Sequence, residues 1–329
     1  MKIEHKMIDK QLRIPGRISK IFIKLSSKTD FIRLRMMLDK MRGKKVKGLN
    51  CSEEWITRRK DGTGLRICIY RPLVSSGAAA GILWMHGGGY AMGVPESSIG
   101  LIRKFIAESG CVVVAPDYRL SLDAPYPAAL DDCHEALLWM KEHAGVLGIR
   151  NDQLMVGGES AGGGLAAAIA LYERDLGGVK IAFQMLLYPM LDDRMTNESA
   201  KKNNAPVWDS DANRVAWGLY LGDLAGNDVP PYAAPARATD FTSLPPAVTF
   251  VGDLEPFRDE TIIYVRDLRD AGVKVDFEIY SGCYHAFDRM NPYAEVSRKA
   301  IAFLMNSFKY AVGHYYAKQC SHTQEFYLS

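Results

Sequence analysis

The sequence predicts an α/β protein whose central sheet is mostly parallel. From residue 81 onward, short apolar runs alternate with helical stretches, which is the pattern of βαβ units. This alternation stops at Tyr188-Pro189 and resumes at Ala247. The chain has 329 residues, of which 48% are hydrophobic and 24% charged, and this composition excludes collagen, coiled coils and extended disorder. We therefore predict that the polar segment 191–235 is a cap inserted into one α/β core.

The first 50 residues are predicted to form two helices, separated near Ser26-Ser27. Four apolar residues of the second helix follow helical spacing and need a surface to bury them: Phe31, Leu34, Leu38 and Met41. Residues 1–50 therefore form an N-terminal helical segment, and the insertion at 191–235 is the predicted cap. Residues 51–190 and 236–329 are then the two parts of the core.

Within the core, each element is predicted from its apolar pattern. Strands are expected at 55–59, 65–70, 82–85, 111–115, 154–156, 181–187, 247–251 and 273–280. Helices are expected at 98–109, 128–143, 161–174, 258–271 and 292–309, with one more in the insertion at 209–221.

Charge is unevenly spread along the chain. Residues 1–50 carry a net charge of +11 and the remainder −8. Such a basic arm either contacts a membrane or nucleic acid, or forms the solvated outer face of packed helices. No aromatic residues alternate with the charges, so nucleic acid is not an expected partner. No apolar run reaches the roughly 20 residues of a membrane span, so no stable membrane insertion is expected.

The cysteines and the N-terminus indicate a cytoplasmic protein. The first 25 residues lack the long apolar region of a secretory signal. No two cysteines form a C-x-x-C pair, so we expect six free thiols: Cys51, Cys68, Cys111, Cys133, Cys283 and Cys320.

The strongest chemical signal is Gly158-Glu159-Ser160-Ala161-Gly162, which fits G-x-S-x-G between a predicted strand and an Ala-rich helix. Small residues allow a tight strand-to-helix turn that presents the Ser hydroxyl at the edge of the sheet. The alternative interpretation is a Gly-rich βα turn that binds phosphate. This is not the first βα unit, and no clear ribose-binding acid follows it.

A second motif, His86-Gly87-Gly88-Gly89, directly follows a predicted strand. Consecutive glycines let the backbone aim its N–H groups at one point, as acyl transfer requires for a developing oxyanion. The alternative is a flexible loop. We expect His86 to brace this loop rather than to act as a base.

A serine nucleophile needs an adjacent base, and His285 suits this role because it follows a predicted strand late in the chain. The triad acid should lie between Ser160 and His285 in the chain, just past a strand end. By position, three carboxylates qualify: Asp253, Glu255 and Asp259.

These motifs resemble the hormone-sensitive-lipase-like carboxylesterases of the α/β-hydrolase fold. Besides the Ser160 motif and the His86 motif, the resemblance rests on residues 117–120, 124–129, 188–189, 255–259 and 285–287, in the order and spacing of that family. It implies an eight-stranded, mostly parallel core flanked by helices, with a helical cap built from residues 1–50 and the insertion at 191–235.

The resemblance also implies roles for single residues. Ser160 matches the nucleophile and His285 the base, while the N–H groups of Gly88, Gly89 and Ala161 match the oxyanion hole, with Gly87 shaping its loop. The sequence departs from the family at three positions: Glu159 where Asp is frequent, Glu255-Pro256-Phe257 in place of Asp-Pro-Leu, and Ala286 where Gly is usual. Glu255 occupies the place of the family's acid, and the following Pro favours extended geometry there. We therefore predict Glu255 as the acid, with Asp253 as the alternative.

The predicted function is that of a serine carboxylesterase acting on short-to-medium acyl esters through an acyl-enzyme, without metal or organic cofactor. The alternatives are hydrolysis of an amide, a carbamate or an acetylated sugar by the same triad and, more remotely, a non-catalytic small-molecule binder. The expected partners are a small-molecule ester substrate and a second copy of the chain in a possible homodimer. Three aromatic residues are candidates for pocket walls, with packing inside the cap as the alternative: Tyr90, Trp208 and Trp217.

Overall fold

The computed structural model describes residues 1–74 and 77–319. Its centre is an eight-stranded sheet with the order β1-β2-β4-β3-β5-β6-β7-β8. The first two pairings, β1 with β2 and β2 with β4, are antiparallel, and every other neighbouring pair is parallel. The prediction of a mostly parallel eight-stranded α/β sheet is therefore confirmed. The strands are β1 Asn50–Thr57, β2 Gly64–Arg71, β3 Ala79–Met85, β4 Val112–Pro116, β5 Ile149–Glu159, β6 Phe183–Leu187, β7 Ala247–Gly252 and β8 Val275–Tyr280.

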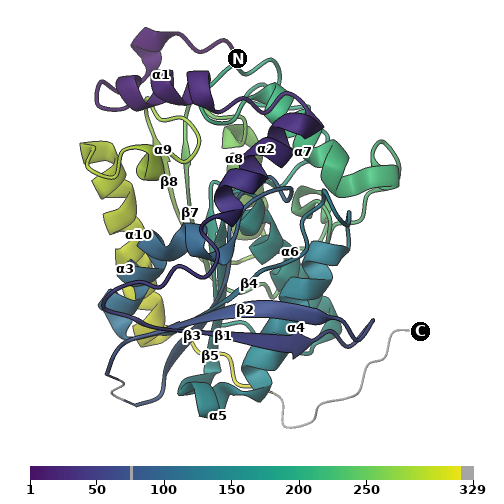
Figure 1. The fold of residues 1–329 in the computed structure, drawn as a ribbon, viewed down its shortest axis with the longest axis vertical. Helices are drawn as coiled ribbons and strands as arrows, with labels where there is room; N and C mark the ends of the chain where they lie inside the picture. The colour runs from purple at the N-terminus through teal and green to yellow at the C-terminus, as the bar shows by residue number, and fades with distance from the viewer. Residues whose placement is uncertain (75–76, 320–329) are drawn as a thin grey trace.

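Helices cover both faces of this sheet (Figure 1). One face packs against α3 (Ile99–Ser109) and α10 (Glu295–His314). The other packs against α4 (Ala128–Glu142), α6 (Ala161–Leu176) and α8 (Arg258–Asp270). The central strands are buried on both faces, which explains why they read in the sequence as continuous apolar runs.

Three helices gather above one end of the sheet (Figure 1): α1 (Arg13–Phe22), α2 (Lys28–Asp39) and α7 (Ser210–Leu221). Phe31 of α2 is fully buried, and Leu34 and Leu38 are half-buried against the same core. Ser27 caps α2 and Asp209 caps α7, each accepting a backbone N–H of the first turn. The two segments predicted to form the cap, 1–50 and 191–235, therefore both contribute helices over the same end of the sheet.

Several short elements carried no detectable periodicity in the sequence. They are α5 (Ala144–Leu147), α9 (Phe287–Met290), and the 3-10 turns η1 (His5–Met7), η2 (Pro95–Ser98), η3 (Gly222–Leu224) and η4 (Pro235–Arg237). The five cysteines in the described part are free thiols, while Cys320 lies outside the described residues. Within that part, no helix is both long and apolar enough to cross a membrane.

Candidate active site

Ser160 stands at the turn between β5 and α6. Its backbone has φ 58° and ψ −118°, a strained conformation for a residue with a side chain. The turn is tight because the helix begins immediately: a Cβ on Gly162 would lie 2.1 Å from the carbonyl oxygen of Met85. The strand-to-helix context predicted for the G-x-S-x-G motif is therefore present, with the hydroxyl held at the carboxyl end of β5.

Three side chains from distant parts of the chain meet at this turn. His285, on the loop after β8, places its Nε2 2.9 Å from Ser160 Oγ. On the other side of the imidazole, His285 Nδ1 lies 2.5 Å from Glu255 Oε2. The second oxygen of Glu255 accepts the Gly252 N–H at 2.8 Å, so both oxygens of the carboxylate are bonded. All three side chains are buried, which strengthens each hydrogen bond by excluding water.

The other two candidate acids face elsewhere. Asp253 accepts hydrogen bonds from the Gly282 and Cys283 N–H groups at 2.8 and 3.3 Å, so it braces the loop that carries His285. Asp259 accepts the Ser199 N–H at 2.8 Å and pairs with its neighbour Arg258. Of the three carboxylates, Glu255 is the one that contacts the imidazole.

The glycine loop lies beside Ser160. A Cβ on Gly87 would sit 3.4 Å from the Ser160 Cβ, and Gly88 and Gly89 have φ values of 129° and 60°. Within the described residues, the amide N–H groups of Gly88, Gly89 and Ala161 bond to no acceptor. The Ala161 amide opens α6, where the helix itself supplies no partner. These donors are therefore free to bind an oxyanion next to the Ser hydroxyl.

His86 packs inside the loop rather than at its opening. Its ring stacks on Tyr118 with centroids 4.2 Å apart, and its Nδ1 donates to the Gly87 carbonyl at 2.9 Å. Burial lowers the pKa of His86 to about 4, so the ring is neutral near pH 7. The bracing interpretation of His86 agrees with these contacts.

The three predicted pocket residues have different surroundings. Trp208 lies over the glycine loop, because a Cβ on Gly89 would collide with its ring, and its ring centroid is 6.1 Å from that of His285. Tyr90 stacks on Tyr220 at 3.7 Å, and Trp217 packs against both. Trp208 therefore borders the triad, whereas Tyr90 and Trp217 have the contacts of packing residues.

Some residues around the triad had not been singled out as site residues. The rings of Tyr188 and Phe257 pack edge-to-face against His285, with centroids 4.9 and 5.1 Å away. Tyr188 directly follows β6 and Phe257 directly precedes α8, and these positions at element ends were the available signal. Glu159, next to the Ser, forms an ion pair with Arg289 of α9, and Arg289 also donates to the Ser97 carbonyl at 2.7 Å. This ion pair joins the Ser turn to the segment that follows His285.

Beside that pair, Asp288 is buried, and its Oδ1 has no hydrogen-bond partner among the described residues. Burial, reinforced by the charge of Glu159, raises the pKa of Asp288 to about 7. Nothing in the sequence pattern distinguished this carboxyl from an exposed one.

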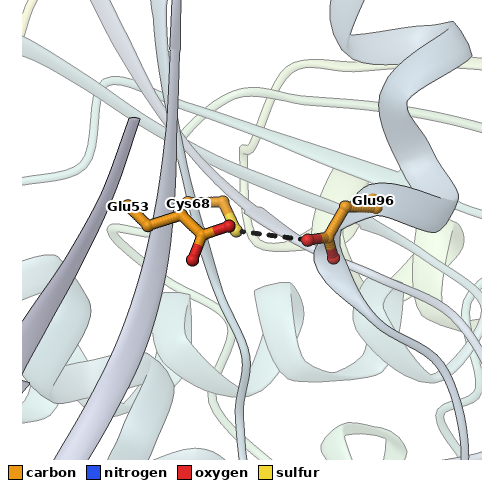
Figure 2. A group of neighbouring side chains, drawn as sticks. All are labelled: Glu53, Cys68 and Glu96. Atoms are coloured by element: carbon orange, nitrogen blue, oxygen red, sulfur yellow. Dashed lines mark hydrogen bonds between the residues drawn. The ribbon is translucent and has the colours of Figure 1, made fainter. Parts of the chain in front are cut away.

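One cluster outside the site has metal-ligand side chains. Donor atoms of Glu53, Cys68 and Glu96 lie within 4.8 Å of one another, and Figure 2 shows the Cys68 thiol pointing at the Glu96 carboxylate, 3.9 Å away. The Arg66 guanidinium pairs with both carboxylates and supplies the positive charge that a metal ion would bring. Burial also raises the pKa of Cys68 to about 12, which keeps the thiol protonated. The cluster fits an ion-pair network better than a metal centre.

The comparisons with known proteins agree with this geometry. Residues 82–289 match a family model described as the alpha/beta hydrolase fold. Esterase LipI of Mycobacterium tuberculosis is 37% identical over 207 residues, which are 63% of this chain and 65% of LipI. Carboxylesterase NlhH of the same organism is 32% identical over 229 residues, covering 68% and 72% of the two chains.

Among solved structures, a bacterial heroin esterase superimposes with a TM-score of 0.86 at 33% identity, covering 94% of this chain and 99% of its own. The likeness therefore extends from the core to the cap. The chain belongs to the hormone-sensitive-lipase-like family of α/β hydrolases, and its relatives across most of its length are carboxylic ester hydrolases.

Proposed function

We propose that this protein is a serine carboxylesterase in which Ser160, His285 and Glu255 form the catalytic triad. The observation that carries the proposal is the unbroken series of contacts from Ser160 Oγ to His285 Nε2 and from His285 Nδ1 to Glu255. Such a series lets the imidazole accept a proton while the carboxylate holds its tautomer and stabilises the imidazolium.

In the first half-reaction, Ser160 Oγ attacks the ester carbonyl carbon and His285 Nε2 takes the hydroxyl proton. The carbonyl oxygen becomes an oxyanion and accepts hydrogen bonds from the N–H groups of Gly88, Gly89 and Ala161, with Gly87 shaping the loop. His285 then gives its proton to the leaving alkoxide as the C–O bond breaks, and the acyl group stays on Ser160.

In the second half-reaction, water replaces the alcohol. His285 takes a proton from the water, whose oxygen attacks the acyl carbon, and the second tetrahedral intermediate uses the same donors. Its collapse returns the proton from His285 to Ser160 Oγ and releases the carboxylic acid. None of these steps draws on a metal or organic cofactor.

We propose that the acyl pocket accepts short-to-medium chains, bounded on the cap side by Trp208. The enclosure of the site supports this, because Ser160 and His285 are only 6% and 4% exposed beneath the cap. We also assign the protein to the cytoplasm, since the five described cysteines are unpaired, as suits a reducing compartment.

Ser160→Ala tests the proposal most directly. The substitution removes the attacking oxygen and should lower kcat on p-nitrophenyl butyrate by as much as about a millionfold. The matched control is Ser97→Ala, on the nearby turn η2, which should keep near-normal activity. A Ser160→Ala protein that retains a tenth of the wild-type rate, with an unchanged melting temperature, would refute the triad.

A further inference from the structure

The first helix of the cap, α1, has two faces of opposite character. Its inner face rests on the loop that carries His285: Gly16 and Ser19 are buried, and a Cβ on Gly16 would lie 2.9 Å from the Tyr284 ring. Its outer face consists of four large apolar side chains that are 51–78% exposed: Ile14, Ile18, Ile21 and Phe22. Their spacing of four, three and one residues places them on one side of the helix.

This outer face differs from ordinary surface composition. Single exposed apolar residues are common on soluble proteins, but a continuous row along one side of a helix marks an interaction surface. The inner face of α1 is already covered by the protein, so the apolar row is not needed for packing. The helix lies at the outer end of the molecule, where a flat partner can reach it (Figure 1).

Basic side chains flank the apolar row. Arg17, Lys20 and Lys24 are all exposed. Among the described residues, no carboxylate lies within 4.0 Å of any of the three cations. Arg17 hydrogen-bonds to the His5 ring at 3.3 Å, and the more distant charge of Lys24 contributes to the lowered pKa of Asp30. The surrounding segment 1–50 has a net charge of +11. These unpaired cations add an electrostatic preference to the apolar surface.

We propose that the outer face of α1 docks the protein reversibly onto membrane surfaces that contain anionic phospholipid. The helix would lie in the plane of the interface, with its apolar row at the boundary between headgroups and acyl chains and its cations against the phosphates. A second copy of this chain fits the surface less well, because a symmetric contact would oppose two strongly basic segments. Docking would place the cap, and the active site beneath it, against the bilayer.

The test is cosedimentation of the full-length protein with vesicles, which requires no enzymatic activity. Wild-type protein should bind vesicles of phosphatidylcholine with 30% phosphatidylglycerol, more weakly in physiological salt than in low salt. Binding to pure phosphatidylcholine should be much weaker. Ile18→Ser/Phe22→Ser should reduce the partition coefficient on anionic vesicles by about tenfold or more.

Two matched controls separate the outer face of α1 from general surface effects. Leu73→Ser/Val146→Ser removes two apolar side chains elsewhere that are also more than half exposed, and should bind like wild type. Arg17→Gln/Lys20→Gln should weaken binding by about tenfold at low salt. Arg266→Gln/Lys299→Gln makes the same change of charge at residues that already have acidic partners, and should have little effect.

Esterase activity on a soluble ester, measured without vesicles, should be unchanged in all four double variants, which confirms that they fold. Equal vesicle binding by wild type and Ile18→Ser/Phe22→Ser would overturn the proposal, as would absence of binding to anionic vesicles. A wild-type dimer in sedimentation equilibrium that Ile18→Ser/Phe22→Ser converts to monomer would also overturn it, because the outer face would then be a self-association surface.

Discussion

At the scale of single residues, the proposed acid of the triad shows how closely two candidates can resemble each other in sequence. Glu255 and Asp253 are two positions apart after the same strand, yet only Glu255 reaches the imidazole, while Asp253 binds the backbone of the His285 loop. The extra methylene of Glu lets a carboxylate placed further along the turn reach back to the ring.

Glu255→Gln should therefore lower kcat by about 10⁴-fold, because the imidazole loses the partner that holds its tautomer. Asp253→Asn should lose far less activity but lower the melting temperature, since its backbone contacts weaken. Steady-state kinetics with p-nitrophenyl butyrate, together with thermal unfolding of both variants, checks this. Greater loss of kcat in Asp253→Asn would transfer the role to Asp253.

Asp288 gives a prediction about pH. Its pKa is about 7 in the folded protein against 3.8 in the unfolded chain, so the folded state holds a proton that the unfolded state has released. Stability should consequently fall as pH rises from about 4 to 7 and stay reduced above that. Asp288→Asn should remove this pH-dependent loss of stability. The difference in unfolding free energy between the variant and wild type should therefore shift in favour of the variant by up to about 4 kcal/mol from pH 4 to pH 8.

Urea unfolding of wild type and Asp288→Asn between pH 4 and pH 8 measures the difference. Asp270→Asn, at an exposed position on α8, is the control and should run parallel to wild type. Parallel curves for Asp288→Asn and wild type would show that Asp288 does not retain its proton.

The residues that sequence analysis located are those with a local signature. Ser160, His285 and Glu255 each follow a strand end and belong to a recognisable motif, so position in the chain was enough to propose them. Trp208 could be suggested only as a guess, and the Glu159–Arg289 pair was missed. Trp208 and His285 are 77 residues apart in the chain, and Glu159 and Arg289 are 130 apart, so no local sequence pattern encodes these contacts.

At the scale of elements, the core strands and long helices were predictable because each has a continuous apolar run or an apolar face. The strand predicted at 154–156 extends in fact from Ile149 to Glu159, since its first residues are partly exposed and lack the apolar signal. Helices of four residues such as α9 are too short for any periodicity. The packing between the two predicted parts of the cap could not be predicted from the sequence, because it depends on contacts such as that of Phe31 with Trp208.

From that contact we predict that α2 supports the proposed active site. Phe31 is fully buried, with its ring edge-on to Trp208 at 6.0 Å between centroids. Phe31→Ala should cost about 3–5 kcal/mol of unfolding free energy and raise KM, because Trp208 loses its packing partner beside His285. Ile32→Ala, at a 41% exposed position of the same helix, should change stability by less than about 0.5 kcal/mol. Urea unfolding and KM measurements test both, and an unchanged KM in Phe31→Ala would show that α2 does not support the pocket.

At the scale of the whole molecule, the proposed cap covers the proposed catalytic centre and should restrict its substrates. We expect kcat/KM to be highest for acyl chains of about two to eight carbons, as suits an enclosed pocket of several hundred Å³. A series of p-nitrophenyl esters from acetate to palmitate measures this preference. Maximal activity on emulsified chains of 16–18 carbons would contradict it.

The attachment of the N-terminal segment to the His285 loop also has a consequence for synthesis on the ribosome. The Tyr284 hydroxyl donates to the Leu12 carbonyl across 272 residues, and the Asp9 N–H donates to the carbonyl of Gly282. Asp9 and Leu12 therefore leave the ribosome about 270 residues before the partners that they bind. Nascent chains that end before His285 lack the proposed base, so the enzyme should acquire activity only after this residue has been synthesised and has left the ribosome.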